Sequence, residues 1–118
     1  SELVILVTAR HYGCDYIWFN HVNLALQHGV APEAVERIKN GQEAVLDAPD
    51  EAAAYAFATE MLRHHTVSDA TLAKTRRCFG DRGAIEMGAI IGHYHSGAIV
   101  LSLADITLPD GSKACLPR

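Results

Sequence analysis

Apolar residues recur at helical spacing along most of the chain. Between residues 14 and 28, apolar side chains such as Ile17, Trp18 and Val22 are three or four positions apart, and Gly29 follows. This period places them on one face of a helix, and glycine is common just after a helix end. The same spacing predicts further helices over residues 32–40, 50–65, 69–79 and 82 to about 105.

Residues that start and stop helices stand at the ends of these segments. Pro32 suits the first turn of a helix, and Gly41 follows the end of the same segment. Ser68 or Asp69 can cap the helix predicted over residues 69–79, and Gly80 follows its end. After residue 105 the chain is rich in proline and glycine, which predicts turns and coil.

Residues 3–8 are the one ambiguous segment. Val4, Ile5 and Val7 would suit a short buried strand as well as a helix. No second strand-like segment of similar quality is present to pair with it, so a helix is the consistent interpretation. The sequence therefore predicts one all-α domain over residues 1–118, a compact bundle of about six helices.

The last predicted helix, residues 82–105, is expected to be the central packing helix. Residues 87–104 contain no Asp, Glu, Lys or Arg but do include several polar side chains, which favours a buried helix over a membrane span. Gly88, Gly92 and Ser96 stand four residues apart, and small residues at that spacing let another helix approach closely. The same stripe also suits ordinary core packing.

Composition narrows the classes of function. The chain has 118 residues, a net charge of -4 and no basic cluster, which argues against nucleic acid or an anionic membrane as partner. Small-molecule or protein partners are expected instead. Three widely spaced cysteines form neither a disulfide framework nor a zinc motif, and residues 1–7 lack the features of a signal peptide. A reducing, cytoplasmic location is the expectation.

The candidate chemistry is centred on residues 14–21. Cys14, Ile17, Trp18 and His21 lie at positions i, i+3, i+4 and i+7, so they share one helix face. Cys14 is at the helix start, where the dipole and free N–H groups favour a thiolate. Seven residues correspond to roughly 10 Å of helix. We therefore exclude a direct hydrogen bond between Cys14 and His21 on this helix.

The register of Glu2, Cys14 and His21 resembles the alkylhydroperoxidase D motif E-x11-C-x-x-C-x-x-x-H, with Ile17 in place of the second cysteine. Residues 14–21, CDYIWFNH, also resemble a branch with the motif C-x-Y-E-W-x-x-H, in which Ile17 replaces the glutamate. The likeness to this carboxymuconolactone decarboxylase and alkylhydroperoxidase D-like superfamily spans nearly all of the chain. It implies that superfamily's helical fold, a homo-oligomer (dimer, trimer or hexamer) and chemistry without metal or organic cofactor.

The resemblance also implies roles for the residues that match. Glu2 and His21 would relay protons, with Glu2 accepting a ring N–H of His21, and Cys14 would be a third catalytic candidate. Without the motif, Cys14 would be interpreted as a small buried hydrophobe and His21 as a core histidine with a satisfied hydrogen bond.

Four further residues are candidates for binding a substrate. Tyr16, Ile17 and Trp18 would form pocket or core walls, and His93 could join His21 across a helix pair. His93 and His95 are two positions apart and point in nearly opposite directions on a helix, so they cannot hold one metal ion together. No metal site is expected.

Three functions remain open from the sequence. The first is a cofactor-free enzyme that transfers protons on a small organic acid or lactone through Glu2 and His21. The second is a thiol peroxidase that uses Cys14. The third is a non-catalytic oligomer that binds a small ligand.

Overall fold

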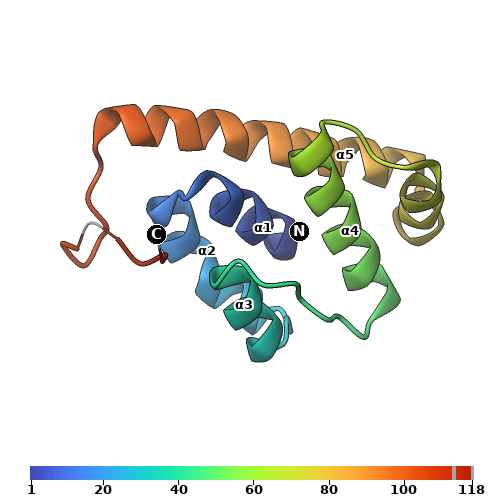
Figure 1. The fold of residues 1–118 in the computed structure, drawn as a ribbon, viewed down its shortest axis with the longest axis horizontal. Coiled ribbons are helices and arrows are strands. Elements are labelled where there is room, and N and C mark those ends of the chain that lie inside the picture. The colour runs from blue at the N-terminus through green and yellow to red at the C-terminus, as the bar shows by residue number, and fades with distance from the viewer. Residues whose placement is uncertain (113, 118) are drawn as a thin grey trace.

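The computed structural model describes residues 1–112 and 114–117. Its helices are α1 (Glu2–Tyr12), α2 (Asp15–Gln27), α3 (Pro32–Lys39), α4 (Pro49–His64) and α5 (Asp69–Ala104). The described residues contain no strand, so the all-α class is confirmed and residues 3–8 are helical (Figure 1). The radius of gyration, 13.9 Å, is close to the value of about 13.5 Å typical of a compact domain of this length.

The described residues form five helices, so the expected number of about six is not confirmed. The segments predicted at 69–79 and 82–105 are joined as α5. They are separated only by a bend at Gly80, whose φ of 75° and ψ of 173° are non-helical. Glycine alone adopts this region readily, and helical hydrogen bonding resumes directly after it. Gly80 therefore divides α5 into two helical parts at a kink, at the boundary that the sequence predicted.

Helix α1 occupies the centre of the molecule and packs against all four other helices. Every residue from Leu3 to Ala9 is buried, on all sides of the helix. A helix that is apolar all round has no face suited to water, so it is enclosed by its neighbours. Within it, the buried hydroxyl of Thr8 donates to the carbonyl oxygen of Val4 at 2.8 Å, which satisfies the one polar side chain there.

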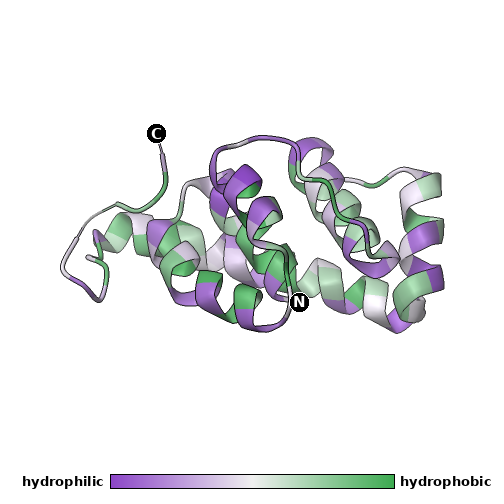
Figure 2. Cartoon of the chain, turned by 90° about the horizontal axis from the view of Figure 1, so that it is seen from below, coloured by the Kyte–Doolittle hydropathy of each residue, from purple (hydrophilic) through white to green (hydrophobic). Residues whose placement is uncertain are grey.

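The prediction that residues 82–105 form the central helix is wrong. This part of α5 runs along one side of α1, and only one of its faces is covered (Figure 1). Met87 and Ile91 are buried, whereas Ile85 and Leu103 are 74% and 83% exposed. Apolar residues extend along the full length of the molecule in Figure 2 rather than being confined to its middle.

Within the described residues, the glycines of the small-residue stripe on α5 face no other helix. A Cβ atom added at Gly88 or Gly92 would meet no atom within 4 Å. Of the helices in the described residues, α5 alone has the length and apolar composition of a membrane span, and 17% of that apolar window is buried in the structure.

Hydrogen bonds join the end of α1 and the C-terminal segment to the start of α2. Gly13, with φ 63°, ends α1, and the N–H of Cys14 donates back to Ala9 at 2.8 Å, so the chain reverses within two residues. The C-terminal segment returns to the same place. One carboxylate oxygen of Asp15 accepts the backbone N–H groups of Cys115 and Leu116, each at 2.9 Å.

Candidate functional site

Glu2 and His21 form the hydrogen bond that the resemblance implies. The Nδ1 atom of His21 lies 2.8 Å from Oε2 of Glu2. Glu2 stands in the first turn of α1 and His21 in the middle of α2, so two packed helices hold the two side chains. The side chain of His21 is 19% exposed and that of Glu2 is 21% exposed, so both are partly shielded from water.

This contact defines the tautomer of His21. A carboxylate only accepts hydrogen bonds, so Nδ1 of His21 carries a proton in the contact with Glu2. Within the described residues, no group is hydrogen-bonded to the other ring nitrogen, Nε2. The geometry therefore leaves Nε2 available as a proton acceptor in the neutral ring and as a donor in the protonated ring.

Tyr94, and not His93, is the residue of α5 whose ring lies against His21. The two ring centroids are 5.3 Å apart and the planes are nearly perpendicular, at 83°. His93 is exposed, and its ring lies 5.0 Å from the ring of Tyr94. The reason is helical phase: Tyr94 follows Ile91 by three residues and shares its inward face, whereas His93 is rotated away from it. The expected partnership of His93 with His21 is therefore corrected.

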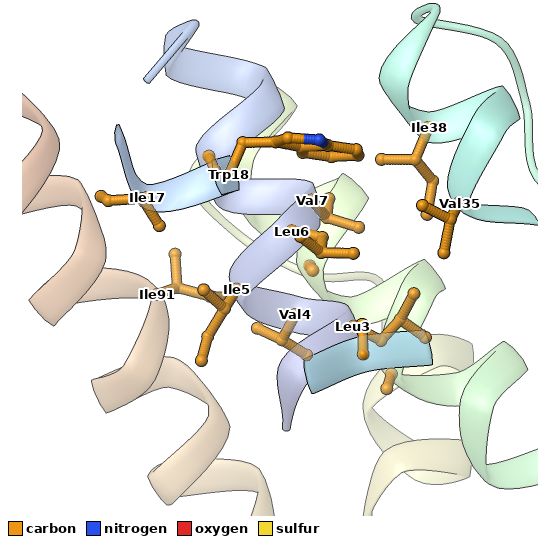
Figure 3. Packing of buried hydrophobic residues seen from close by; sticks show 14 of the residues in the cluster. Leu3, Val4, Ile5, Leu6, Val7, Ile17, Trp18, Val35, Ile38 and Ile91 are labelled. Carbon is orange, nitrogen blue, oxygen red and sulfur yellow. The ribbon is translucent and has the colours of Figure 1, made fainter. Parts of the chain in front are cut away.

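The helix face predicted from residues 14, 17, 18 and 21 is the inward face of α2. Cys14, Ile17 and Trp18 are 8%, 5% and 3% exposed. Figure 3 shows Trp18 above Val7 of α1 and directed towards α3, while Ile17 points to α5. Ile17 and Trp18 are therefore core walls between helices. Tyr16 is half-buried beside them.

Cys14 is the N-cap residue of α2 and not part of its first turn. Its backbone is extended, with φ −87° and ψ 96°, and its side chain makes no capping hydrogen bond. It borders a hollow of about 220 Å³ between the start of α2 and the end of α5, which Tyr16 also borders. The thiol is thus buried but adjacent to a surface hollow.

Glu2 borders a different hollow from Cys14. That hollow, of about 360 Å³, lies between α1, α4 and the end of α2, and Asp50 and Glu51 are also among its lining residues. Neither hollow is lined by His21. The three catalytic candidates therefore do not share one cavity: Glu2 and His21 form one unit and Cys14 another.

The other two cysteines occupy separate places. Cys78 is exposed on α5, and its Sγ is 3.9 Å from the carbonyl oxygen of Pro49. Cys115 lies on the returning C-terminal segment, with Sγ 3.4 Å from the carbonyl oxygen of Asp15. Sequence reasoning missed the proximity of Cys115 to the start of α2, because no local pattern connects residues 100 positions apart.

No family model, curated protein or solved structure matches the chain. Within the residues that the structure describes, no group of three His, Cys, Asp or Glu side chains has an arrangement that could hold a metal ion.

Proposed function

We propose that this chain is a cofactor-free acid–base enzyme of the carboxymuconolactone decarboxylase type, with His21 as the general acid or base and Glu2 as its positioning residue. The observation that carries the proposal is the 2.8 Å contact between Nδ1 of His21 and Oε2 of Glu2. A carboxylate on one ring nitrogen sets the tautomer and stabilises the imidazolium, which leaves the other nitrogen to exchange protons with a substrate. The motif register of Glu2, Cys14 and His21 adds support.

The substrate in this proposal meets His21 at Nε2, on the side away from Glu2. The hollow beside Glu2 also carries Asp50 and Glu51, so its negative field opposes an anionic ligand. The edge contact between His21 and Tyr94 orients the ring from the α5 side. The substrate is a small organic acid or lactone.

The proton balance of a decarboxylation fits one imidazole. The substrate carboxylate leaves as carbon dioxide, and the electron pair of the broken C–C bond passes into the conjugated lactone as a dienolate. The imidazolium of His21 then donates its Nε2 proton to carbon, and Glu2 stabilises the positive ring until that transfer. Solvent returns a proton to His21, so the net reaction consumes one proton and releases carbon dioxide.

A thiol peroxidase is the alternative, favoured by Cys14 beside its hollow. A dithiol cycle needs a second cysteine to resolve the sulfenic acid, and the position one turn away is Ile17. We therefore expect no sustained turnover of an alkyl hydroperoxide with a dithiol reductant. Turnover that is lost in Cys14→Ser but retained in Cys78→Ser and Cys115→Ser would favour the peroxidase instead.

The enzymatic test uses carboxymuconolactone as probe, with ultraviolet absorbance and carbon dioxide release as readouts. His21→Ala should lower kcat/KM by about 100-fold or more, the usual scale for a positioned acid or base. Cys14→Ala should cost much less, and His64→Ala, an exposed histidine on α4, serves as the matched control. If Cys14→Ala abolishes turnover while His21→Ala retains it, the assignment of His21 is wrong.

A test that needs no substrate examines the tautomer directly. In ¹⁵N NMR of the neutral side chain, Nδ1 of His21 should be the protonated nitrogen and Nε2 the unprotonated one. Glu2→Ala should return His21 to the tautomer mixture shown by His64. A wild-type His21 protonated at Nε2 would contradict the proposed geometry.

A further inference from the structure

A polar cavity of about 220 Å³ lies between α1, α3 and α4, at the opposite end of α1 from Glu2. Its floor is apolar, formed by Val7, Ile38 and Leu62. Its remaining lining is a set of hydrogen-bonding residues and one glycine: Arg10, His11, Gly41, Gln42, Tyr55, Thr59 and Arg63. An apolar floor with a few converging polar groups is the usual form of a small-molecule site.

Arg10 is held in place at this cavity. Its Nε donates to the carbonyl oxygen of Lys39 at 2.7 Å, which connects α1 to the end of α3. Gly41, with φ 72°, lies beside the guanidinium, and a Cβ atom there would be 3.3 Å from Nη2 of Arg10. Glycine at this position therefore leaves room around a guanidinium group whose direction is already set.

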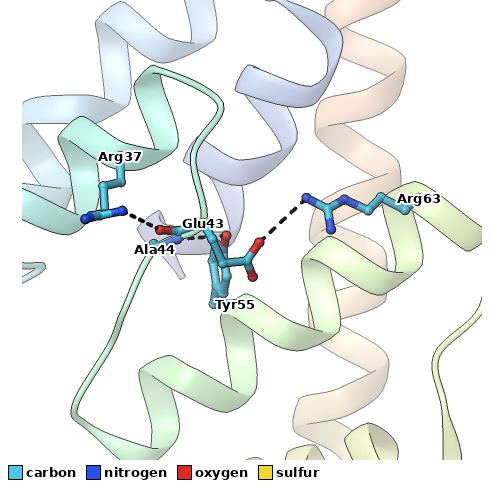
Figure 4. Close-up of polar contacts among 5 residues, drawn as sticks. All are labelled: Arg37, Glu43, Ala44, Tyr55 and Arg63. Atoms are coloured by element: carbon cyan, nitrogen blue, oxygen red, sulfur yellow. Dashed lines mark hydrogen bonds and ion pairs between the residues drawn. The ribbon is translucent and has the colours of Figure 1, made fainter.

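The charge around the cavity is positive although the chain carries a net charge of -4. Arg63 has one carboxylate nearby, Glu43, at a loose 4.0 Å, and both side chains are largely exposed (Figure 4). Burial lowers the pKa of His11, and the positive charges of Arg63, His65 and His95 lower it further. Cations thus dominate the electrostatic surroundings of His11.

Two hydroxyl groups at the cavity have unused hydrogen-bonding capacity. The buried Oγ1 of Thr59 has no hydrogen-bond partner in the described residues. Buried polar atoms are nearly always paired, so an unpaired one in a cavity indicates a missing partner. The hydroxyl of Tyr55 accepts the N–H of Ala44 at 3.2 Å (Figure 4), so its own proton can be donated elsewhere.

We propose that this cavity binds a small monocarboxylate, whose carboxylate lies between Arg10 and Arg63 and whose apolar body faces the floor. The hydroxyl groups of Thr59 and Tyr55 donate to the same ligand. An apolar cavity of about 150 Å³ can hold benzene, so the volume suits a ligand the size of benzoate. This site is separate from the pair of Glu2 and His21, since Arg10 and Glu2 are eight residues, or about 12 Å, apart along α1.

The test is a titration of the intact chain with benzoate, followed by amide chemical shifts and calorimetry. We expect saturable shifts around the cavity, a Kd on the order of 1 mM, and much weaker binding of the neutral isostere benzamide. Arg63→Met should weaken benzoate binding about 10-fold or more. Arg77→Met, at an exposed arginine on α5, should leave it unchanged. Equal binding of benzamide, or full affinity in Arg63→Met, would overturn the proposal.

Thr59→Val separates binding from folding. Valine has nearly the shape of threonine and lacks the unpaired hydroxyl, so the melting temperature should stay the same or rise. Benzoate affinity should nevertheless fall several-fold. If Thr59→Val binds benzoate as tightly as the wild type, the hydroxyl of Thr59 does not donate a hydrogen bond to the ligand.

Discussion

Helices α1 and α5 are both rich in apolar residues, but the structure puts them in opposite surroundings. All residues from Leu3 to Ala9 of α1 are buried, whereas much of the apolar surface of α5 faces solvent. α1 has neighbours on every side, and α5 has them on one. Apolar content therefore did not decide burial. Burial was decided by the number of helices that pack against each of the two.

The largest expected effect is a truncation in α1. Leu6 is fully buried, so Leu6→Ala should lower the free energy of unfolding by about 3 kcal/mol, through lost transfer energy and a residual cavity. Urea denaturation measures it. A loss below about 1 kcal/mol would mean that α1 is not the centre of the core.

The second effect concerns the bend in α5. Gly80 has a φ of 75° and no atom within 4 Å of an added Cβ, so Gly80→Ala meets a backbone penalty and no steric clash. We expect a loss of about 1–2 kcal/mol in urea denaturation. Gly88→Ala, in the helical part of α5, is the control and should not destabilise. Equal behaviour of the two variants would show that the bend is absent in solution.

A matched truncation on the outer face of α5 should cost little. Ile85 is 74% exposed, so Ile85→Ala should change the unfolding free energy of the monomer by about 0.5 kcal/mol or less. The comparison with Leu6→Ala isolates burial from residue type. An effect of Ile85→Ala that grows with protein concentration would come from self-association through α5.

The smallest effect is a pH dependence at the junction of α4 and α5. The pKa of Glu60 is lowered from 4.5, chiefly by the N–H of Ser68 and then by the hydroxyl of Thr71, both of which donate to its carboxylate. A lowered folded-state pKa stabilises the fold above pH 4.5, and this contribution disappears as the pH falls through the folded pKa. Glu60→Gln should reduce the slope of stability against pH below 4.5 by a small amount, measured by thermal melts. An unchanged slope in Glu60→Gln would contradict this contribution of Glu60 to stability.

The candidate site shows the same division between local and distant information. The helix face of Cys14, Ile17, Trp18 and His21 was predicted from spacing and is inward in the structure. The contact of Glu2 with His21 was predicted from the motif register and is present. The contact of the Tyr94 ring with His21 was missed, although the spacing of Tyr94 from Ile91 was a usable signal.

The sequence by itself determined where helices begin and end, because caps, prolines and glycines act on residues within one turn. Pro32 starts α3, Ser68 caps α5 and Gly13 ends α1. Those signals depend on backbone hydrogen bonds between near neighbours, so they can be recognised without knowing the fold.

Only the tertiary structure decided which helix is central, which hollow each candidate borders and where the C-terminal segment returns. Asp15 binds the backbone of Cys115 and Leu116 across 100 positions, and no periodicity predicts such a contact. Packing depends on the shapes and lengths of all helices together. A single helix cannot encode through its own residues how many others will cover it.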